Sequence, residues 1–186
     1  MAKGVCPTWV GYFLINPLRK ILENPDKIFR QVVHEGMIVL EPGCGMGFFT
    51  LPLARKVGAT GRVIAIDVQP KMLTVLTNRA KKAGLLERIE IRQAGPDRLR
   101  IEDLSGTIDF VAALHVVHEV SNPTDFFAEI WEALKPGGKI LVVEPKGHVN
   151  RTQFKETVTF AEQIGFNVIT EFSKISARKC LLQKRF

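Results

Sequence analysis

The sequence predicts an α/β protein with a mostly parallel, seven-stranded sheet, helices on both faces and a C-terminal antiparallel hairpin. Three observations predict this class. Apolar runs such as IVL, VIAI, FVAAL and ILVV alternate with predicted helices, which is typical of βαβ units. The runs are continuously apolar, as expected of parallel strands covered on both faces. The 186-residue length fits one domain with one hydrophobic core.

Local signals mark each element. Asn24 and Pro25 form a helix start, with an N-cap followed by proline at the first helical position, and this helix is expected to run to about His34. Residues 136–138 (Pro-Gly-Gly) and Gly165 end two later helices. The predicted helices span residues 9–22, 25–34, 48–57, 71–83, 124–134 and 152–164. The predicted strands span residues 37–41, 62–67, 89–93, 107–114, 139–144, 167–173 and 177–184.

Composition narrows the class of protein. Hydrophobic residues make up 46% and charged residues 24% of the chain, as in ordinary globular proteins. No apolar run is long enough to span a membrane, and no secretory leader is recognisable, so we expect a cytoplasmic protein. Cys6, Cys44 and Cys180 are odd in number and widely spaced, which favours free thiols over disulfides or a zinc site.

The net charge of +7 is concentrated in residues 71–100 and in the last forty residues. A basic balance favours acidic partners such as RNA, anionic lipid or a phosphorylated small molecule. An ordinary solvated surface explains the same charges. Charge alone therefore does not select a partner.

A glycine-rich loop follows the first predicted strand and opens a helix, with the sequence EPGCGMG over residues 41–47. Glycines there allow positive φ and let a ligand approach bare backbone. Ligands of open α/β sheets bind beyond the carboxyl ends of the strands, where this loop lies. Asp67 ends the second predicted strand and is placed to accept hydrogen bonds from ribose hydroxyls.

Two residues argue against a dinucleotide ligand. Glu41 would repel a pyrophosphate, whereas it would attract an ammonium group. Phe48 is bulky at the third small position of the G-x-G-x-x-G/A pattern, and the observed spacing is G-x-G-x-G. S-adenosylmethionine combines a ribose, an adenine and an ammonium without any phosphate. It is therefore the expected cofactor.

Four motifs in the correct order then resemble class I S-adenosylmethionine-dependent methyltransferases. They are VLEPGCGMGFFT, VIAIDVQPKML, IDFVAALHVVHEV and LKPGGKILVVEP, and the resemblance covers about residues 35–145. More narrowly, the chain is similar to the small-molecule methyltransferases of the ubiquinone/menaquinone group. The resemblance implies a Rossmann-like, doubly wound fold. Residues 35–186 would form the cofactor-binding domain, and residues 1–34 a helical segment and candidate lid, within one structural domain.

The resemblance also implies roles for individual residues. Glu41, Gly43 and Gly45, with Cys44 between the glycines, would hold the methionine end of the cofactor. Asp67 would bind the ribose hydroxyls. Three further residues are expected to pack on the adenine or to lie near the sulfonium, namely Val68, Met72 and Leu114.

The segment after the third strand departs from the family pattern. Gly95 stands where the family often has an Asp that accepts from the adenine amine. Either Asp97 replaces that Asp from two residues further on, or the backbone recognises the adenine alone.

Methyl transfer requires mainly proximity and orientation, and a general base is needed only if the acceptor loses a proton. The candidate bases are His115 and His118, which follow the fourth strand at the ligand edge of the sheet. Either histidine could instead cap a loop or pack a helix. Glu144 ends the fifth strand and could hold an acceptor or cap the next turn. No metal-ligand spacing is present, so we expect no metal.

The expected function is methyl transfer from S-adenosyl-L-methionine to a small-molecule acceptor. Three alternatives remain at this point: an RNA or protein methyltransferase, a non-catalytic S-adenosylmethionine-binding protein, and a nicotinamide oxidoreductase. The LHVVHEV segment lacks the N-P-P-Y pattern that grips a planar amino group. Glu41, Phe48 and the lack of a Tyr-x-x-x-Lys pair disfavour the oxidoreductase. The sequence does not specify the acceptor or the oligomeric state.

Overall fold

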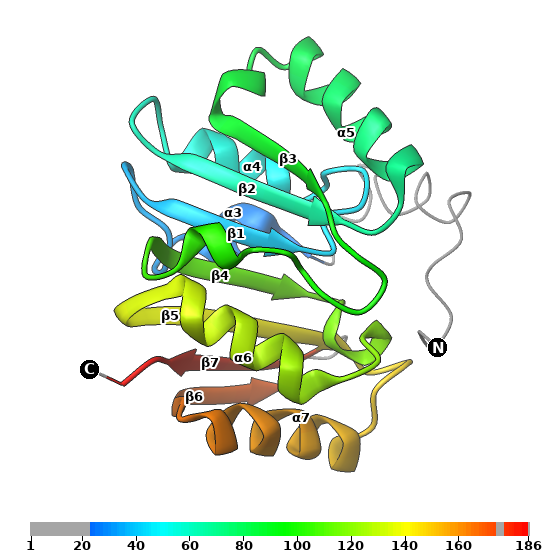
Figure 1. Ribbon diagram of the computed structural model, residues 1–186, viewed down its shortest axis with the longest axis vertical. Coiled ribbons are helices and arrows are strands. Elements are labelled where there is room, and N and C mark those ends of the chain that lie inside the picture. The colour runs from blue at the N-terminus through cyan, green and yellow to red at the C-terminus, as the bar shows by residue number, and fades with distance from the viewer. Residues whose placement is uncertain (1–22, 174–176, 186) are drawn as a thin grey trace. The chain divides into compact units, whose positions relative to one another are not determined.

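Seven strands of one sheet and the helices around them make up the computed structural model, which describes residues 23–173 and 177–185 (Figure 1). The described chain divides into two compact units, residues 23–94 and residues 95–185, and each is described by itself. The predicted helix over residues 9–22, with most of the candidate lid, lies outside the described residues. The single-domain organisation stays a prediction.

The first unit is a parallel βαβ assembly with the strand order β3-β2-β1. Its strands are β1 (Ile38–Pro42), β2 (Arg62–Asp67) and β3 (Ile89–Gln93). Its helices are α3 (Pro25–Phe29), α4 (Thr50–Lys56) and α5 (Pro70–Lys82). The helix α4 packs against β2, and α5 packs against β2 and β3. The side of α5 that is buried carries apolar residues at helical spacing: Met72, Leu73, Leu76 and Ala80.

The second unit contains the strands in the order β4-β5-β7-β6. They are β4 (Ile108–Leu114), β5 (Leu134–Pro145), β6 (Asn167–Ser173) and β7 (Ala177–Gln183). The pair β4 and β5 is parallel, whereas β7 runs antiparallel to both β5 and β6. The helices α6 (Pro123–Ala133) and α7 (Arg151–Ile164) pack on each other and on β5 and β6 respectively (Figure 1). The predicted fold class, including the C-terminal hairpin, is confirmed.

Several predicted boundaries are wrong. The helix from Pro25 ends at Phe29 rather than near His34, and the Phe29 carbonyl accepts from the N–H groups of both Val32 and Val33, a sharing that is common at helix ends. The next helix begins at Thr50 rather than at residue 48, because the glycine loop continues through Gly47.

The boundary between α6 and β5 also differs from the prediction. The helix ends at Ala133, before residues 136–138, which lie inside β5. Leu134 pairs with Ile108 of β4, and a register shift follows before Phe110 pairs with Lys139. The irregular pairing explains how a Pro-Gly-Gly segment fits within the bounds of a strand.

No helix in the described ranges has the length and apolarity that crossing a bilayer requires.

Candidate functional site

The loop between β1 and α4 has a glycine with positive φ at alternate residues. Gly43, Gly45 and Gly47 have φ values of 70°, 53° and 82°, in the left-handed region that favours glycine. Two backbone hydrogen bonds fix the loop: Cys44 N–H donates to the Ile66 carbonyl on β2 at 3.0 Å, and Gly47 N–H donates to the Cys44 carbonyl at 3.0 Å. The glycine pattern therefore forms a defined turn at the carboxyl end of β1.

Two glycines of this loop serve different purposes. A Cβ at Gly47 would lie 2.4 Å from Leu76 Cδ1, and Leu76 is fully buried, so this glycine lets the loop pack on α5. A Cβ at Gly45 would meet nothing within 4 Å. The space beside Gly45 is open, as a site for a ligand against bare backbone requires.

We predict that alanine at Gly47 lowers mainly the stability, whereas alanine at Gly45 lowers mainly the affinity for the cofactor. Gly47→Ala should lower the free energy of unfolding by about 2 kcal/mol, because overpacking adds to backbone strain. Gly45→Ala should cost about 1 kcal/mol of strain, yet weaken cofactor binding more than Gly47→Ala does. Urea denaturation and calorimetry on both variants check this. Equal loss of stability in the two variants would contradict the assignment.

Asp67 is held at the end of β2 by two backbone donors. Its Oδ2 accepts from Gly45 N–H at 2.8 Å, and its Oδ1 accepts from Gln69 N–H at 2.9 Å. The side chain is buried, with 8% exposure. Burial raises the pKa of Asp67, and the hydrogen bonds from Gln69 and Gly45 oppose that rise. The carboxylate thus joins β2 to the glycine loop and keeps lone pairs for a ligand hydroxyl.

Glu41 is a buried carboxyl group with an unfilled hydrogen-bonding capacity. Its exposure is 2%, and its Oε2 has no hydrogen-bond partner within the described chain. The buried Thr50 Oγ1 is also without a partner there. Burial raises the pKa of Glu41 to about 8, with the charge of Asp67 adding to the rise and the neighbouring Thr50 hydroxyl opposing it. A ligand that brings a positive charge or a donor to Oε2 would satisfy this group.

Cys44 lies close to both carboxylates. Burial raises the pKa of the Cys44 thiol well above its ordinary value, and the charges of Glu41 and Asp67 add to the rise. The thiol is therefore protonated and is a poor nucleophile. Its place in the loop agrees with a small, packed side chain.

Arg79 anchors the loop from α5, and sequence reasoning missed it. Its guanidinium donates to the Met46 carbonyl inside the glycine loop, and burial lowers the pKa of Arg79. Nothing in the sequence separates Arg79 from the other basic residues of this segment. The contact becomes visible only when α5 packs beside the loop.

The two residues expected to pack on adenine follow β2. Val68 is 37% exposed, which is high for a large apolar side chain, whereas Met72 is buried in the first turns of α5. An exposed valine directly after Asp67 is available to an apolar ligand surface.

Gly95 and Asp97 begin the second unit. Gly95 N–H donates to the Arg98 carbonyl at 2.9 Å, and a Cβ at Gly95 would lie 2.9 Å from Arg100 Nε. Asp97 is exposed, and its Oδ1 accepts from Ser121 Oγ at 3.0 Å. The roles proposed for Gly95 and Asp97 in adenine recognition stay predictions.

Leu114 and His115 lie at the end of β4. Leu114 is buried, with 5% exposure. His115 has a φ of 59°, which is uncommon for a residue with a side chain, and its N–H donates to the Val143 carbonyl at 2.7 Å. Such strained positions are frequent at functional sites.

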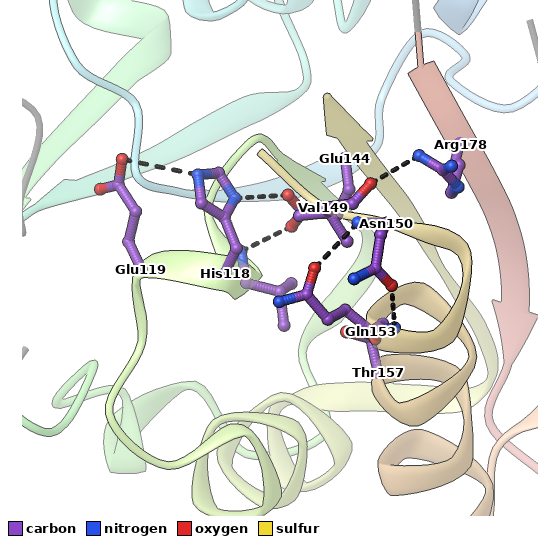
Figure 2. A network of polar contacts seen from close by, with 9 residues as sticks. His118, Glu119, Glu144, Val149, Asn150, Gln153, Thr157 and Arg178 are labelled. Atoms are coloured by element: carbon purple, nitrogen blue, oxygen red, sulfur yellow. Dashed lines mark hydrogen bonds and ion pairs between the residues drawn. The ribbon is translucent and has the colours of Figure 1, made fainter. Parts of the chain in front are cut away.

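His118 forms a pair with a buried carboxylate (Figure 2). His118 Nδ1 lies 2.5 Å from Glu144 Oε2, and the other oxygen, Oε1, accepts from Val117 N–H at 2.9 Å. Glu144 has no exposed surface. The hydrogen bond to Glu144 raises the pKa of His118, against the opposing effect of burial, and the charges of Glu144 and Glu119 add to the rise. Glu144 thus binds the backbone of the turn after β4 and the ring of His118, and its role in holding an acceptor stays a prediction.

The segment after β5 is held by hydrogen bonds at two adjacent residues, Val149 and Asn150 (Figure 2). Arg178 of β7 donates through Nη1 to the Val149 carbonyl at 2.5 Å. Asn150 caps α7 and forms a reciprocal capping box with Gln153. The segment that follows Glu144 at the end of β5 is therefore held in place by hydrogen bonds.

Among the described residues, no group of three or more histidine, cysteine, aspartate or glutamate side chains is arranged to hold a metal ion. Cys44 and Cys180 are free and buried, and Cys6 lies outside the described residues.

Fold and loop geometry together define a class of protein. The family described as "Methyltransferase domain" matches residues 40–142, more than half of the 186 residues, and the chain belongs to this family. A SAM dependent methyltransferase from Aquifex aeolicus has a similar crystal structure, with a TM-score of 0.87 at 24% sequence identity. The superposition covers 96% of this chain and 99% of that one, which confirms the Rossmann-like fold.

Two curated relatives are similar to the chain in sequence. The chain is 30% identical over 150 residues to a demethylmenaquinone methyltransferase from Lactobacillus johnsonii, covering 76% of this chain and 61% of the relative. It is 28% identical over 145 residues to a ubiquinone/menaquinone biosynthesis C-methyltransferase from Hydrogenovibrio crunogenus, covering 78% of this chain and 55% of the relative. The chain thus spans little more than half the length of these relatives.

Proposed function

We propose that this chain is an S-adenosylmethionine-dependent methyltransferase that acts on a small-molecule acceptor. The observation that carries the proposal is the buried, unpartnered Oε2 of Glu41 beside a glycine loop with open space at Gly45. S-adenosylmethionine supplies a methyl group on a sulfonium, which leaves as a neutral thioether and needs no acid. Membership of the methyltransferase-domain family supports the same activity.

The residues of the first unit fit this cofactor. Glu41 Oε2 would pair with the ammonium of the methionine part, which satisfies a buried acceptor that otherwise has none in the described chain. Asp67 would accept from the ribose hydroxyls, because its oxygens are already oriented by Gly45 and Gln69. Val68 and Met72 would offer apolar surface to the adenine, and the backbone at Gly43 and Gly45 would lie against the methionine part.

Several residues of the second unit are further candidates from the sequence. Leu114 and His115 would serve the reacting end of the cofactor and the acceptor, and Gly95 and Asp97 the adenine edge. His115 and His118 are the candidate proton acceptors. The names of the two curated relatives favour a ring-bearing acceptor of the quinone type, because one names demethylmenaquinone and the other the biosynthesis of ubiquinone and menaquinone.

Methyl transfer from labelled S-adenosylmethionine tests the proposal. The chain should incorporate label into at least one member of a panel of reduced quinones, phenols and other small molecules. RNA and protein substrates serve as comparison. Transfer to RNA or protein alone would overturn the small-molecule assignment. Binding of the cofactor with no transfer to any substrate would indicate a non-catalytic binding protein.

A further inference from the structure

We propose that Glu144 is a positioning residue that holds His118 with the proton on Nδ1, so that Nε2 accepts a proton from the methyl acceptor. This inference rests on the proposed methyltransferase function. Of the two candidate histidines, it selects His118 rather than His115 as the group that accepts the proton. It also implies that the methyl acceptor is a molecule whose reacting group carries an acidic proton.

The distances support one orientation of the imidazole. Glu144 Oε2 lies 2.5 Å from His118 Nδ1, within hydrogen-bonding distance, whereas Glu144 Oε1 accepts from Val117 N–H. An ionised carboxylate only accepts hydrogen bonds, so it requires a proton on Nδ1. The neutral imidazole then has its lone pair on Nε2. The same division of roles operates where a buried carboxylate orients a catalytic histidine.

Glu144 is itself fixed in place. It has no exposed surface, and both of its oxygens are engaged, one by His118 and the other by Val117 N–H at 2.9 Å. The parallel register of β4 and β5 pairs Leu114 with Val143, which brings the residues after β4 beside the end of β5. A carboxylate needed only to cap the Val117 turn would not have to contact an imidazole as well.

Within the described part of the chain, three ionisable groups lie close to His118. Glu144 comes from β5, Glu119 from the short 3-10 helix Val117–Glu119 that also carries His118, and His148 from the segment after β5 (Figure 2 shows the two glutamates). Glu119 Oε1 is 3.9 Å from His118 Nε2, and the rings of His118 and His148 are 5.5 Å apart in an edge-to-face arrangement. The side chain of Glu119 is 28% exposed, whereas Glu144 is buried, so solvent screens the charge of Glu119 more strongly.

Proton transfer to His118 accompanies methyl transfer, so that bonds and charges balance in the reaction. As the acceptor atom bonds to the methyl carbon, the bond between that carbon and sulfur breaks, and its electron pair stays on sulfur. The proton of the acceptor's reacting group moves to His118 Nε2. The resulting imidazolium is stabilised by the negative charge of Glu144 and later releases its proton to water.

Nitrogen-15 NMR of the ligand-free protein tests the positioning role without any substrate. The chain has four histidines, so the His118 resonances can be assigned by comparison with His118→Gln. Wild type should show the Nδ1–H tautomer and a pKa above the ordinary 6.5. Glu144→Gln should lower that pKa and lose the fixed tautomer, whereas the matched control Glu119→Gln should keep the tautomer. A proton on Nε2 in wild type, or an equal effect of the two substitutions, would overturn the proposal.

The pH profile of methyl transfer tests the catalytic part. For each acceptor that is methylated, kcat should rise as His118 loses its proton, above pH 6.5. Glu144→Gln should lower the plateau kcat about 100-fold and move the rising limb to lower pH, because the negative charge is gone. Glu119→Gln should change kcat less than about threefold. If His118→Gln leaves the pH profile of kcat unchanged, the inference is contradicted. If wild type does not bind S-adenosylmethionine at all, the proposed function is refuted instead.

Discussion

Asp67→Asn is expected to weaken S-adenosylmethionine binding by at least about 100-fold, which corresponds to about 3 kcal/mol. Both carboxylate oxygens accept backbone N–H groups, from Gly45 and Gln69. An amide can accept only on its oxygen, so its NH2 group would face one of these donors and displace it. The substitution would also remove the charge that binds the ribose hydroxyls. Loss of hydrogen bonds to a charged group is large enough to account for the expected effect.

Isothermal titration calorimetry measures this effect directly. Asp26→Asn is the matched control, because Asp26 is an exposed residue in the first turn of α3. Thermal unfolding of both variants should show that each is folded at the titration temperature. If Asp67→Asn is folded and binds the cofactor as tightly as wild type, then Asp67 is not part of the site.

Glu41→Gln is expected to change both stability and binding as a function of pH. The pKa of Glu41 in the folded chain is about 8, above its ordinary 4.5. A raised pKa means that the folded state holds the proton more tightly, so the stability from Glu41 is fully present below pH 4.5 and is lost as pH rises through 8. The loss is at most about 5 kcal/mol. Glu41→Gln should therefore gain stability relative to wild type as pH rises, as measured by urea unfolding at pH 5 and at pH 8.

In wild type, the affinity for S-adenosylmethionine should increase with pH, whereas the contribution of Glu41 to stability decreases. An ammonium ligand selects the ionised form of Glu41, so affinity should increase up to about tenfold per pH unit between pH 5.5 and 7.5, where an α-amino group stays mostly charged. Glu41→Gln should bind more weakly, with little dependence on pH. Adenosine, which lacks the amino acid part, is the matched control ligand. A pH dependence that is the same for adenosine and S-adenosylmethionine would contradict the contact with Glu41.

Local patterns were sufficient to predict most of the fold. The strands β2, β3 and β6 begin and end where the sequence predicts, because short apolar or β-branched runs are bounded by turn residues. Glycine spacing also predicted the loop after β1, and the structure brings Gly45 and Asp67 together in a hydrogen bond. Such features depend on neighbours in sequence and on the rule that parallel strands share one ligand edge.

Other features depend on packing between distant segments. The His118–Glu144 pair joins residues 26 positions apart, and only the register between β4 and β5 brings them into contact. The Arg79–Met46 contact needs α5 to lie beside the glycine loop. The early end of α3 at Phe29 could not be predicted either, because the sequence contains no proline or glycine signal near residue 30.

The central claim is that the glycine loop, Glu41 and Asp67 form a binding site for S-adenosylmethionine. Calorimetric titration of the wild-type chain at pH 7.5 with S-adenosylmethionine and, separately, with NAD tests it most directly. We expect saturable binding of one S-adenosylmethionine per chain and no measurable binding of NAD. Binding of NAD without binding of S-adenosylmethionine would contradict it.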